Sequence, residues 1–197
     1  YMLNIGPRGD GSVAMRCANS LRTAGDWIAR YPQVVYDVGG SPWQHAMPWG
    51  DVTSKNEIMF LSVFQWPSSG ELYLPNVQQD VERVKLLCDS ESVDLVCERR
   101  GKHIVIKVPA KAPDPLASVI QLNFSKTPII DPVLTIDPEA TTRLPVEFAD
   151  VEGLKKSEKR WMEKFGEWKR IVHGHEFNTD AELSWEVDVL VPGEYQV

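Results

Sequence analysis

The sequence is poor in cysteine, has no excess of basic charge, and contains no long apolar run. Its three cysteines, Cys17, Cys88 and Cys97, are too few for a disulfide framework and lack the spacing of a zinc site. Lysine and arginine number 21 against 28 aspartate and glutamate residues, which gives a net charge of −7. Nucleic acids and anionic membrane surfaces require a basic face, so neither is an expected partner. No apolar run approaches the roughly 20 residues that span a bilayer.

Cys88 and Cys97 flank a predicted hairpin turn, which leaves two alternatives open. A disulfide forms only if the strand register places the two side chains opposite each other. The other alternative is a pair of buried free thiols.

The 197 residues suffice for one domain of ordinary size or two small ones. With 43% hydrophobic and 25% charged residues, the composition is typical of a globular protein that buries a core. Residues 1–7 resemble a strand already under way, and residues 194–197 resemble a strand cut short. We therefore expect both ends to be truncated.

The first 30 residues predict a strand, a turn and a helix. Residues 1–5 are apolar and are closed by Gly6 and Pro7, and a helix is predicted over 12–30 with Ser12 or Asp10 as its N-cap. Its apolar positions step by three or four residues: Val13, Cys17, Leu21, Ala24 and Ile28. This is half of a βαβ unit, which cannot bury both of its faces alone. The sequence therefore predicts a packing partner that this chain does not supply.

The middle of the chain predicts a sandwich. A connector rich in proline, glycine and tryptophan spans 31–56, after which apolar residues recur with a period of two. Strands are predicted at 57–66, 71–75, 81–88, 93–98, 103–108 and 118–124. Short strands separated by turn residues are typical of an antiparallel β-sandwich, here over 56–128, so the expected fold class is mainly β.

The last third predicts a linker and a smaller module. The linker 128–138 carries Pro128, Pro132 and Pro138. A short helix is predicted at 154–165, because Leu154, Trp161, Phe165 and Trp168 fall on one helical face. Residues 182–190 alternate again, which predicts a strand.

Several short motifs follow one another in a fixed order over residues 1–127. They are Leu3-Asn4-Ile5-Gly6-Pro7 with Asp10-Gly11, Gly25-Asp26-Trp27-Ile28, Val34-Val35-Tyr36 with Pro42-Trp43, Phe64-Gln65-Trp66-Pro67 with Leu72 to Pro75, and Val108-Pro109 with Pro113-Asp114-Pro115. In this order and spacing they resemble the end of α-L-fucosidases of glycoside hydrolase family 29. Asp37-Val38 departs from the family pattern, where Gly-Thr is usual. Residues 140–197 loosely resemble an accessory β-module of some bacterial members, with Phe165-Gly166-Glu167-Trp168-Lys169 and Ser184-Trp185-Glu186-Val187 as its marks.

The resemblance implies a (β/α)8 barrel followed by a β-sandwich. Residues 1–55 are then the end of the catalytic barrel and a connector, 56–128 the C-terminal sandwich, and 129–197 a linker and a truncated accessory β-module. The resemblance also implies a secreted or periplasmic bacterial enzyme that hydrolyses α-L-fucosidic bonds in glycans with retention and without a cofactor. The sequence does not indicate an oligomeric state.

No residue of this chain is expected to be catalytic. Retention requires two carboxyl groups ~5–5.5 Å apart, and a barrel enzyme carries them at the C-terminal ends of its strands. In the family both groups lie upstream of the last barrel strand, so neither maps onto this sequence.

Asn4, Trp43 and Trp49 are the candidate substrate-binding residues. Asn4 lies in the stretch expected to reach the catalytic face of the barrel. It either supports the fucose pocket through a hydrogen bond or satisfies the backbone of the Gly6-Pro7 loop. Trp43 and Trp49 lie in the connector, where they either stack on sugar rings or seal the interface between barrel and sandwich.

Three further motifs have simple structural interpretations. Arg8-Gly9-Asp10 spells an integrin-type tripeptide but falls in a tight turn. His173, His175 and Glu176 have metal-donor spacing without a third separated ligand, so no metal is expected. Asn123-Phe124-Ser125 is a formal glycosylation sequon inside a predicted strand.

The alternative to a fucosidase is a non-catalytic carbohydrate-binding or spacer module. Exposed indole rings can serve as stacking platforms for sugars. The candidates in this chain are Trp161, Trp168 and Trp185.

Overall fold

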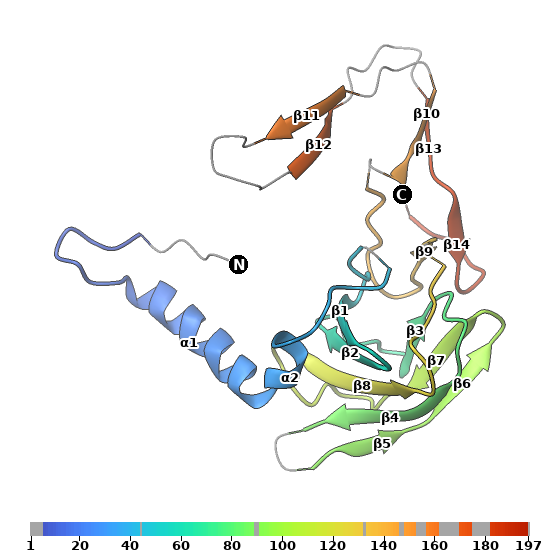
Figure 1. The fold of residues 1–197 in the computed structure, drawn as a ribbon, viewed down its shortest axis with the longest axis horizontal. Coiled ribbons are helices and arrows are strands. Elements are labelled where there is room, and N and C mark those ends of the chain that lie inside the picture. The colour runs from blue at the N-terminus through green and yellow to red at the C-terminus, as the bar shows by residue number, and fades with distance from the viewer. Residues whose placement is uncertain are drawn as a thin grey trace. The chain divides into compact units, whose positions relative to one another are not determined.

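The alternating segments of the sequence form strands in the computed structural model, which describes residues 6–43, 45–88, 91–131, 133–145, 148–152, 157–161, 170–174 and 182–196. The chain divides into two compact units, residues 1–132 (unit 1) and 133–197 (unit 2). Unit 1 begins with helices α1 (Met15–Arg30) and α2 (Pro32–Val35). Its strands follow in chain order (Figure 1): β1 (Gly50–Lys55), β2 (Ile58–Val63), β3 (Glu71–Leu74), β4 (Val81–Leu87), β5 (Val93–Leu95), β6 (Cys97–Arg100), β7 (His103–Lys107) and β8 (Ser118–Phe124).

Two antiparallel sheets make up the β part of unit 1. One has the order β1-β2-β8-β4-β5 and the other the order β3-β7-β6. Alternate residues of both sheets are almost completely buried and form the core between them: Met59, Leu61, Ile120 and Leu122 from the first sheet, and Leu72, Leu74, Ile104 and Ile106 from the second. The expected fold class, mainly β with an antiparallel sandwich, is confirmed.

The outer face of the first sheet is also covered at its centre. Phe60 of β2 and Val119 of β8 lie on this face, and both are buried in a cluster with Tyr31 and Val34. Because Tyr31 and Val34 belong to the segment that links α1 to β1, this segment packs on the sheet rather than running free as a connector.

The sandwich begins earlier than the sequence pattern indicates. β1 occupies residues 50–55 of the predicted connector and pairs with β2 along its whole length. Gly50 opens the strand where a Cβ atom would lie 2.0 Å from the carbonyl oxygen of Ser62, so only glycine fits. The outer edge of β1 is covered as well, because Gly39 and Ser54 exchange two backbone hydrogen bonds of 2.7 and 3.1 Å.

Helix α1 confirms the predicted period but begins later than expected. Its first residue is Met15, its N-cap residue is Ala14, and no side chain caps its N-terminus. The expected start at residue 12 and the expected cap by Ser12 or Asp10 are therefore wrong. None of the residues of α1 is buried, and the helix extends away from the sheets (Figure 1).

Asp10 makes a local turn instead of capping the helix. Its Oδ1 accepts hydrogen bonds from the backbone N and the hydroxyl of Ser12, at 2.9 and 2.7 Å. These bonds lower the pKa of the Asp10 carboxyl. Gly11 completes the turn with a φ of +80°. The interpretation of Arg8-Gly9-Asp10 as part of a tight turn is confirmed.

Two buried indole rings cap the free edge of the second sheet. β3 lies at the edge of this sheet, and the carbonyl of Gly70 accepts a bond from Val108 N. In an antiparallel ladder alternate residues bond to the neighbouring strand, so Tyr73 and Pro75 present their carbonyls to the free edge. There the Nε1–H of Trp49 donates to the Tyr73 carbonyl at 3.1 Å, and that of Trp43 to the Pro75 carbonyl at 2.9 Å. An edge that would otherwise be open to another strand is thereby closed.

Unit 2 consists of short paired strands. They are β9 (Leu134–Ile136), β10 (Asp150–Glu152), β11 (Ser157–Trp161), β12 (Arg170–Gly174), β13 (Glu182–Ser184) and β14 (Val187–Val189). β10 pairs with β13 and β11 with β12, both antiparallel, and β14 pairs with β9 in parallel. The predicted strand at 182–190 is therefore two strands in two sheets, and the predicted linker contains β9.

The helix predicted at 154–165 is wrong. Residues 157–161 form β11, which pairs over five positions with β12. The spacing of the aromatic residues at 161, 165 and 168 suits a helix but does not exclude a strand. The backbone of the polar segment 157–161 makes its hydrogen bonds with β12 instead.

The cysteines carry free thiols, and Cys88 and Cys97 are half-buried. In the antiparallel β4–β5 ladder, Val84 pairs with Leu95 and Leu86 pairs with Val93. Cys88 follows the end of β4, whereas the residues after Leu95 lie towards the start of β4. The two cysteines thus lie beyond opposite ends of the β4–β5 ladder and cannot form a disulfide. Burial is the main cause of the raised pKa of the Cys97 thiol.

We predict that Trp43→Phe lowers the free energy of unfolding by about 1–3 kcal/mol, because the buried Pro75 carbonyl loses its donor while most of the packing is kept. Trp66→Phe is the matched control. Trp66 also donates to a carbonyl, that of Pro109 at 2.7 Å, but Pro109 is exposed and water can replace the indole. Urea unfolding of both variants measures the difference. Equal losses would contradict the edge-capping role of Trp43.

Candidate functional site

The end of α1 is joined to the sandwich by an ion pair with a buried carboxylate. Arg30 Nη1 lies 2.8 Å from Asp114 Oδ2, and only 3% of the Asp114 side chain is exposed, against 39% for Arg30. The other carboxylate oxygen, Oδ1, accepts backbone hydrogen bonds from Leu116 at 2.8 Å and Ala117 at 3.4 Å. Asp114 therefore organises its own loop with one oxygen and holds the helix with the other.

Two neighbours of Arg30 complete this joint. The Nε1–H of Trp27 donates to the carbonyl of Ala117 at 2.8 Å, across 90 positions of the chain. The Trp27 and Tyr31 rings are tilted against each other with centroids 5.4 Å apart, and the Arg30 guanidinium lies 5.6 Å from the centre of the Tyr31 ring. We call Trp27, Arg30, Tyr31, Asp114 and Ala117 the helix–sandwich joint.

The structure brings together motifs that are far apart in the sequence. Trp27 of the second motif contacts the residues that follow Asp114 of the last one. Trp43 donates to Pro75, at the end of the Leu72 to Pro75 motif, and Trp66 donates to Pro109. Each of these motif tryptophans is thus bonded to the backbone of another segment, which explains why their order and spacing matter to the fold.

The structure describes two of the three candidate substrate-binding residues. Asn4 lies outside the described residues. The side chains of Trp43 and Trp49 are 0% and 2% exposed. Their burial supports a packing role, and neither ring has an open face for a sugar in this structure. Sugar stacking by Trp43 and Trp49 stays a prediction.

The structure bears on metal ligands and membrane-spanning helices only for the residues that it describes. Among the residues that the structure describes, no three His, Cys, Asp or Glu side chains are grouped as metal ligands. His173 lies in β12, whereas His175 and Glu176 lie outside the described residues. In the described part of the chain, no helix is long and apolar enough to cross a membrane.

Comparison with known proteins supports the family that the motifs suggest. No family model matches the sequence. The plasma alpha-L-fucosidase of Pongo abelii is 26% identical over 117 residues, which cover 55% of this chain and 24% of the relative. The crystal structure of an alpha-L-fucosidase GH29 from Bacteroides thetaiotaomicron is 29% identical with a TM-score of 0.52 and covers 62% of this chain and 28% of that one. The resemblance to α-L-fucosidases of glycoside hydrolase family 29 is confirmed.

The likeness to fucosidases covers part of each protein. The alpha-L-fucosidase from Vibrio sp. strain EJY3 has a TM-score of 0.56 over 80% of this chain and 30% of its own, and at 19% identity it shows the fold alone. The chain spans about a quarter of the length of the curated relative named above. It is therefore related to one portion of a fucosidase.

The sequence interpretation overlooked the pairing of Arg30 with Asp114. Asp114 was identified only as the centre of the Pro113-Asp114-Pro115 motif. The position of Asp114 between two prolines was the available signal for a structural role of its carboxylate. Prolines have no backbone N–H to donate, so the carboxylate must accept hydrogen bonds from residues further along the chain. The partner across 84 positions could not be read from the sequence.

A second charged cluster lies on the outer face of β3, β7 and β6. The guanidinium of Arg100 binds both carboxylate oxygens of Glu71, at 2.6 and 2.7 Å, and its Nε donates to Glu98 at 2.6 Å. Lys107 and the hydroxyl of Tyr73 also bind Glu71. The Arg100 bonds are the main reason why the pKa of Glu71 lies far below its usual range. Every charge here has a partner, so the cluster is a stabilising network rather than an open site.

We predict that the stabilising effect of this network is lost in acid. Because the pKa of Glu71 is lowered in the folded state, its contribution is fully present above the unfolded-state value of about 4.3 and declines as the pH falls through the folded value. The difference in unfolding free energy between the wild type and Glu71→Gln should therefore be large at pH 7 and shrink below about pH 4.

Urea unfolding at pH 7, 5 and 3 measures this difference. Glu82→Gln, at an exposed position of β4, is the matched control and should show a smaller difference at pH 7. A Glu71→Gln difference that stays constant over the three pH values would disprove the role of the network.

Proposed function

We propose that this chain is the C-terminal part of a retaining α-L-fucosidase that hydrolyses α-L-fucosidic bonds in glycans. In this proposal the preceding polypeptide supplies the rest of a (β/α)8 barrel with both catalytic carboxyl groups, and the sandwich carries no catalytic residue. The likeness to fucosidases over about 60% of the chain supports it. We further propose that the enzyme is bacterial, secreted or periplasmic, and needs no cofactor.

The unburied apolar face of α1 carries this proposal. The helix repeats apolar residues on one side, from Cys17 to Ile28, over about three turns, yet none of its residues is buried. Of the stripe residues within α1, Cys17 and Ala24 are exposed, and Leu21 and Ile28 are half-buried. Stable amphipathic helices bury their apolar stripe, since most of their stability comes from packing. A barrel helix has the required partner, because it packs against the strands and helices of its own barrel.

In this proposal Asn4 and the connector residues Trp43 and Trp49 have separate roles. Asn4 would lie at the end of the last barrel strand, within reach of the fucose pocket. Trp43 and Trp49, which are buried against β3, would seal the side of the sandwich that faces the barrel.

We predict that the 197-residue chain alone releases no 4-nitrophenol from 4-nitrophenyl α-L-fucoside, because neither catalytic carboxyl group is present. Joined to the polypeptide that its gene encodes upstream, it should become active. Activity of the isolated chain would refute the absence of the catalytic groups. An inactive longer protein, folded by circular dichroism and containing no barrel, would refute the fucosidase.

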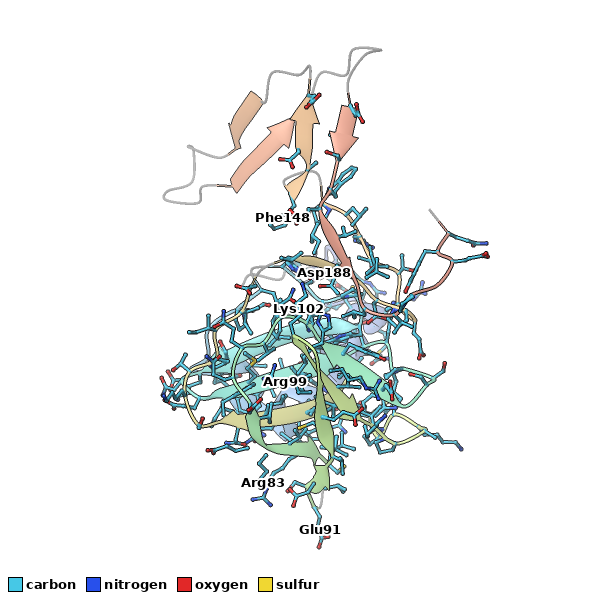
Figure 2. All side chains as sticks on the ribbon, turned by 90° about the vertical axis from the view of Figure 1, so that its right-hand side faces the viewer. Arg83, Glu91, Arg99, Lys102, Phe148 and Asp188 are labelled. Carbon is cyan, nitrogen blue, oxygen red and sulfur yellow. The ribbon has the colours of Figure 1, made fainter. Side chains whose placement is uncertain are left out.

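Unit 2 supports a second candidate function, the binding of glycans without catalysis. The carbonyl oxygen of Pro145 accepts hydrogen bonds from Trp185 Nε1 at 2.9 Å and from the backbone N of Phe148 at 3.1 Å. The same carbonyl thus joins the Trp185 indole to the backbone of the segment that carries Phe148. Phe148, which is labelled in Figure 2, is 41% exposed, and Trp185 is half-buried. Aromatic side chains commonly line ligand sites, and exposed ones can stack on sugar rings.

The other two tryptophans proposed as platforms have no described side chains. Trp161 lies in β11, and Trp168 lies outside the described residues.

We predict that Trp185→Ala in the whole chain abolishes retention on immobilised fucosylated glycan. Tyr195→Ala is the matched control, because Tyr195 is an exposed aromatic residue of the same unit, and it should bind as the wild type does. Wild-type chain that passes the column unretained would refute glycan binding by unit 2, whatever the outcome for catalysis.

A further inference from the structure

We propose that Arg30 and Asp114 are positioning residues that fix the direction in which α1 presents its apolar face to the catalytic domain. The catalytic domain is part of the proposed function, on which this inference rests. The arrangement of the joint itself does not depend on it.

The joint holds α1 through a single turn. Trp27 and Arg30 are spaced by three residues, so their side chains leave the helix on one side, and Tyr31 follows directly as the C-cap residue. Each makes a different contact with the sandwich: Trp27 a hydrogen bond, Arg30 an ion pair, and Tyr31 a place in the buried cluster with Phe60 and Val119. Three contacts from one turn fix both the tilt and the rotation of a helix, which one contact cannot do.

The apolar stripe of α1 is left uncovered by this arrangement. At about 100° per residue, the mean direction of Cys17, Leu21, Ala24 and Ile28 lies about a third of a turn from that of Trp27 and Arg30. The sandwich therefore binds a flank of the helix and leaves the stripe available to another partner. A change in the joint would rotate the stripe.

The charge of Asp114 makes the joint sensitive to substitution. Its carboxylate is almost completely buried, and the Arg30 guanidinium lies 2.8 Å from it. Removing the Arg30 charge leaves this buried carboxylate without its cation. Arg83 and Asp94 form a similar contact at 2.9 Å on the surface of β4 and β5, where both side chains are more than half exposed. This surface pair is the matched control.

Hydrogen exchange of the whole 197-residue chain tests the joint. We expect Asp114→Asn and Arg30→Gln to raise the exchange rates of the amides of residues 27–31 by about tenfold or more, while amides of β2 and β8 keep their rates. Arg30→Lys should restore most of the protection, and Arg83→Gln should change nothing in α1. Trp27→Phe removes only the indole donor and gives an independent measurement if Asp114→Asn does not fold.

Two outcomes overturn the proposal. The first is an amide exchange rate of residues 27–31 that equals the wild-type rate in both Arg30→Gln and Trp27→Phe. An increase that occurs only when the amides of β2 and β8 also exchange faster would count the same way. The second concerns the full-length enzyme, in which a positioning role predicts a lower kcat with little change in KM for Arg30→Gln, and recovery in Arg30→Lys. Wild-type kcat in Arg30→Gln would overturn the positioning of the catalytic domain. A full-length protein without fucosidase activity in any variant would instead refute the proposed function, and the exchange result would still decide whether the joint fixes α1.

Discussion

The buried carboxylate of Asp114 is the constraint on which the connection between helix and sandwich depends. A carboxylate taken out of water must be paired and hydrogen-bonded, and Asp114 meets both conditions by binding Arg30 with one oxygen and its own loop with the other. The loop that ends in β8 and the last turn of α1 are therefore fixed by the same group. A helix that buries none of its own residues keeps a defined place on unit 1 through this contact together with the Trp27 hydrogen bond and the packing of Tyr31.

Indole hydrogen bonds extend the same principle to the rest of unit 1. Trp27, Trp43, Trp49 and Trp66 each donate to a backbone carbonyl in a distant segment. Each ring contributes apolar area, and its single polar atom finds a partner that would otherwise need water. At the free edge of β3 this closes a row of carbonyls that another strand could join. The tryptophan-rich connector is thus part of the sandwich rather than a tether between domains.

Much of the fold could be predicted from local patterns, and the failures have identifiable causes. The strand predicted at 93–98 is two strands in different sheets, β5 and β6, and neither has a buried residue. Alternation identified the other strands from β2 to β8, because each of these buries residues in a common core. It missed β1, whose residues Thr53 and Ser54 are polar and whose outer neighbour is the covering segment at Gly39. The helix predicted at 154–165 failed because aromatic spacing at three and four residues is compatible with a strand when a hairpin partner is present. In the candidate site, Trp43 and Trp49 were identified as important residues, whereas Arg30 and Asp114 were not recognised as a pair.

The sequence by itself determined the periods of the segments, the amphipathic character of α1 and the order of the motifs that resemble fucosidases. These properties depend on neighbours within a few residues, so they can be read along the chain. Only the tertiary structure decided that the indole rings of Trp43 and Trp49 are buried, that Asp114 pairs with Arg30, and that the cysteines stay apart. Burial and ion pairing are set by residues that meet after the chain has folded, in one case across 90 positions, and no local pattern encodes which distant segment arrives.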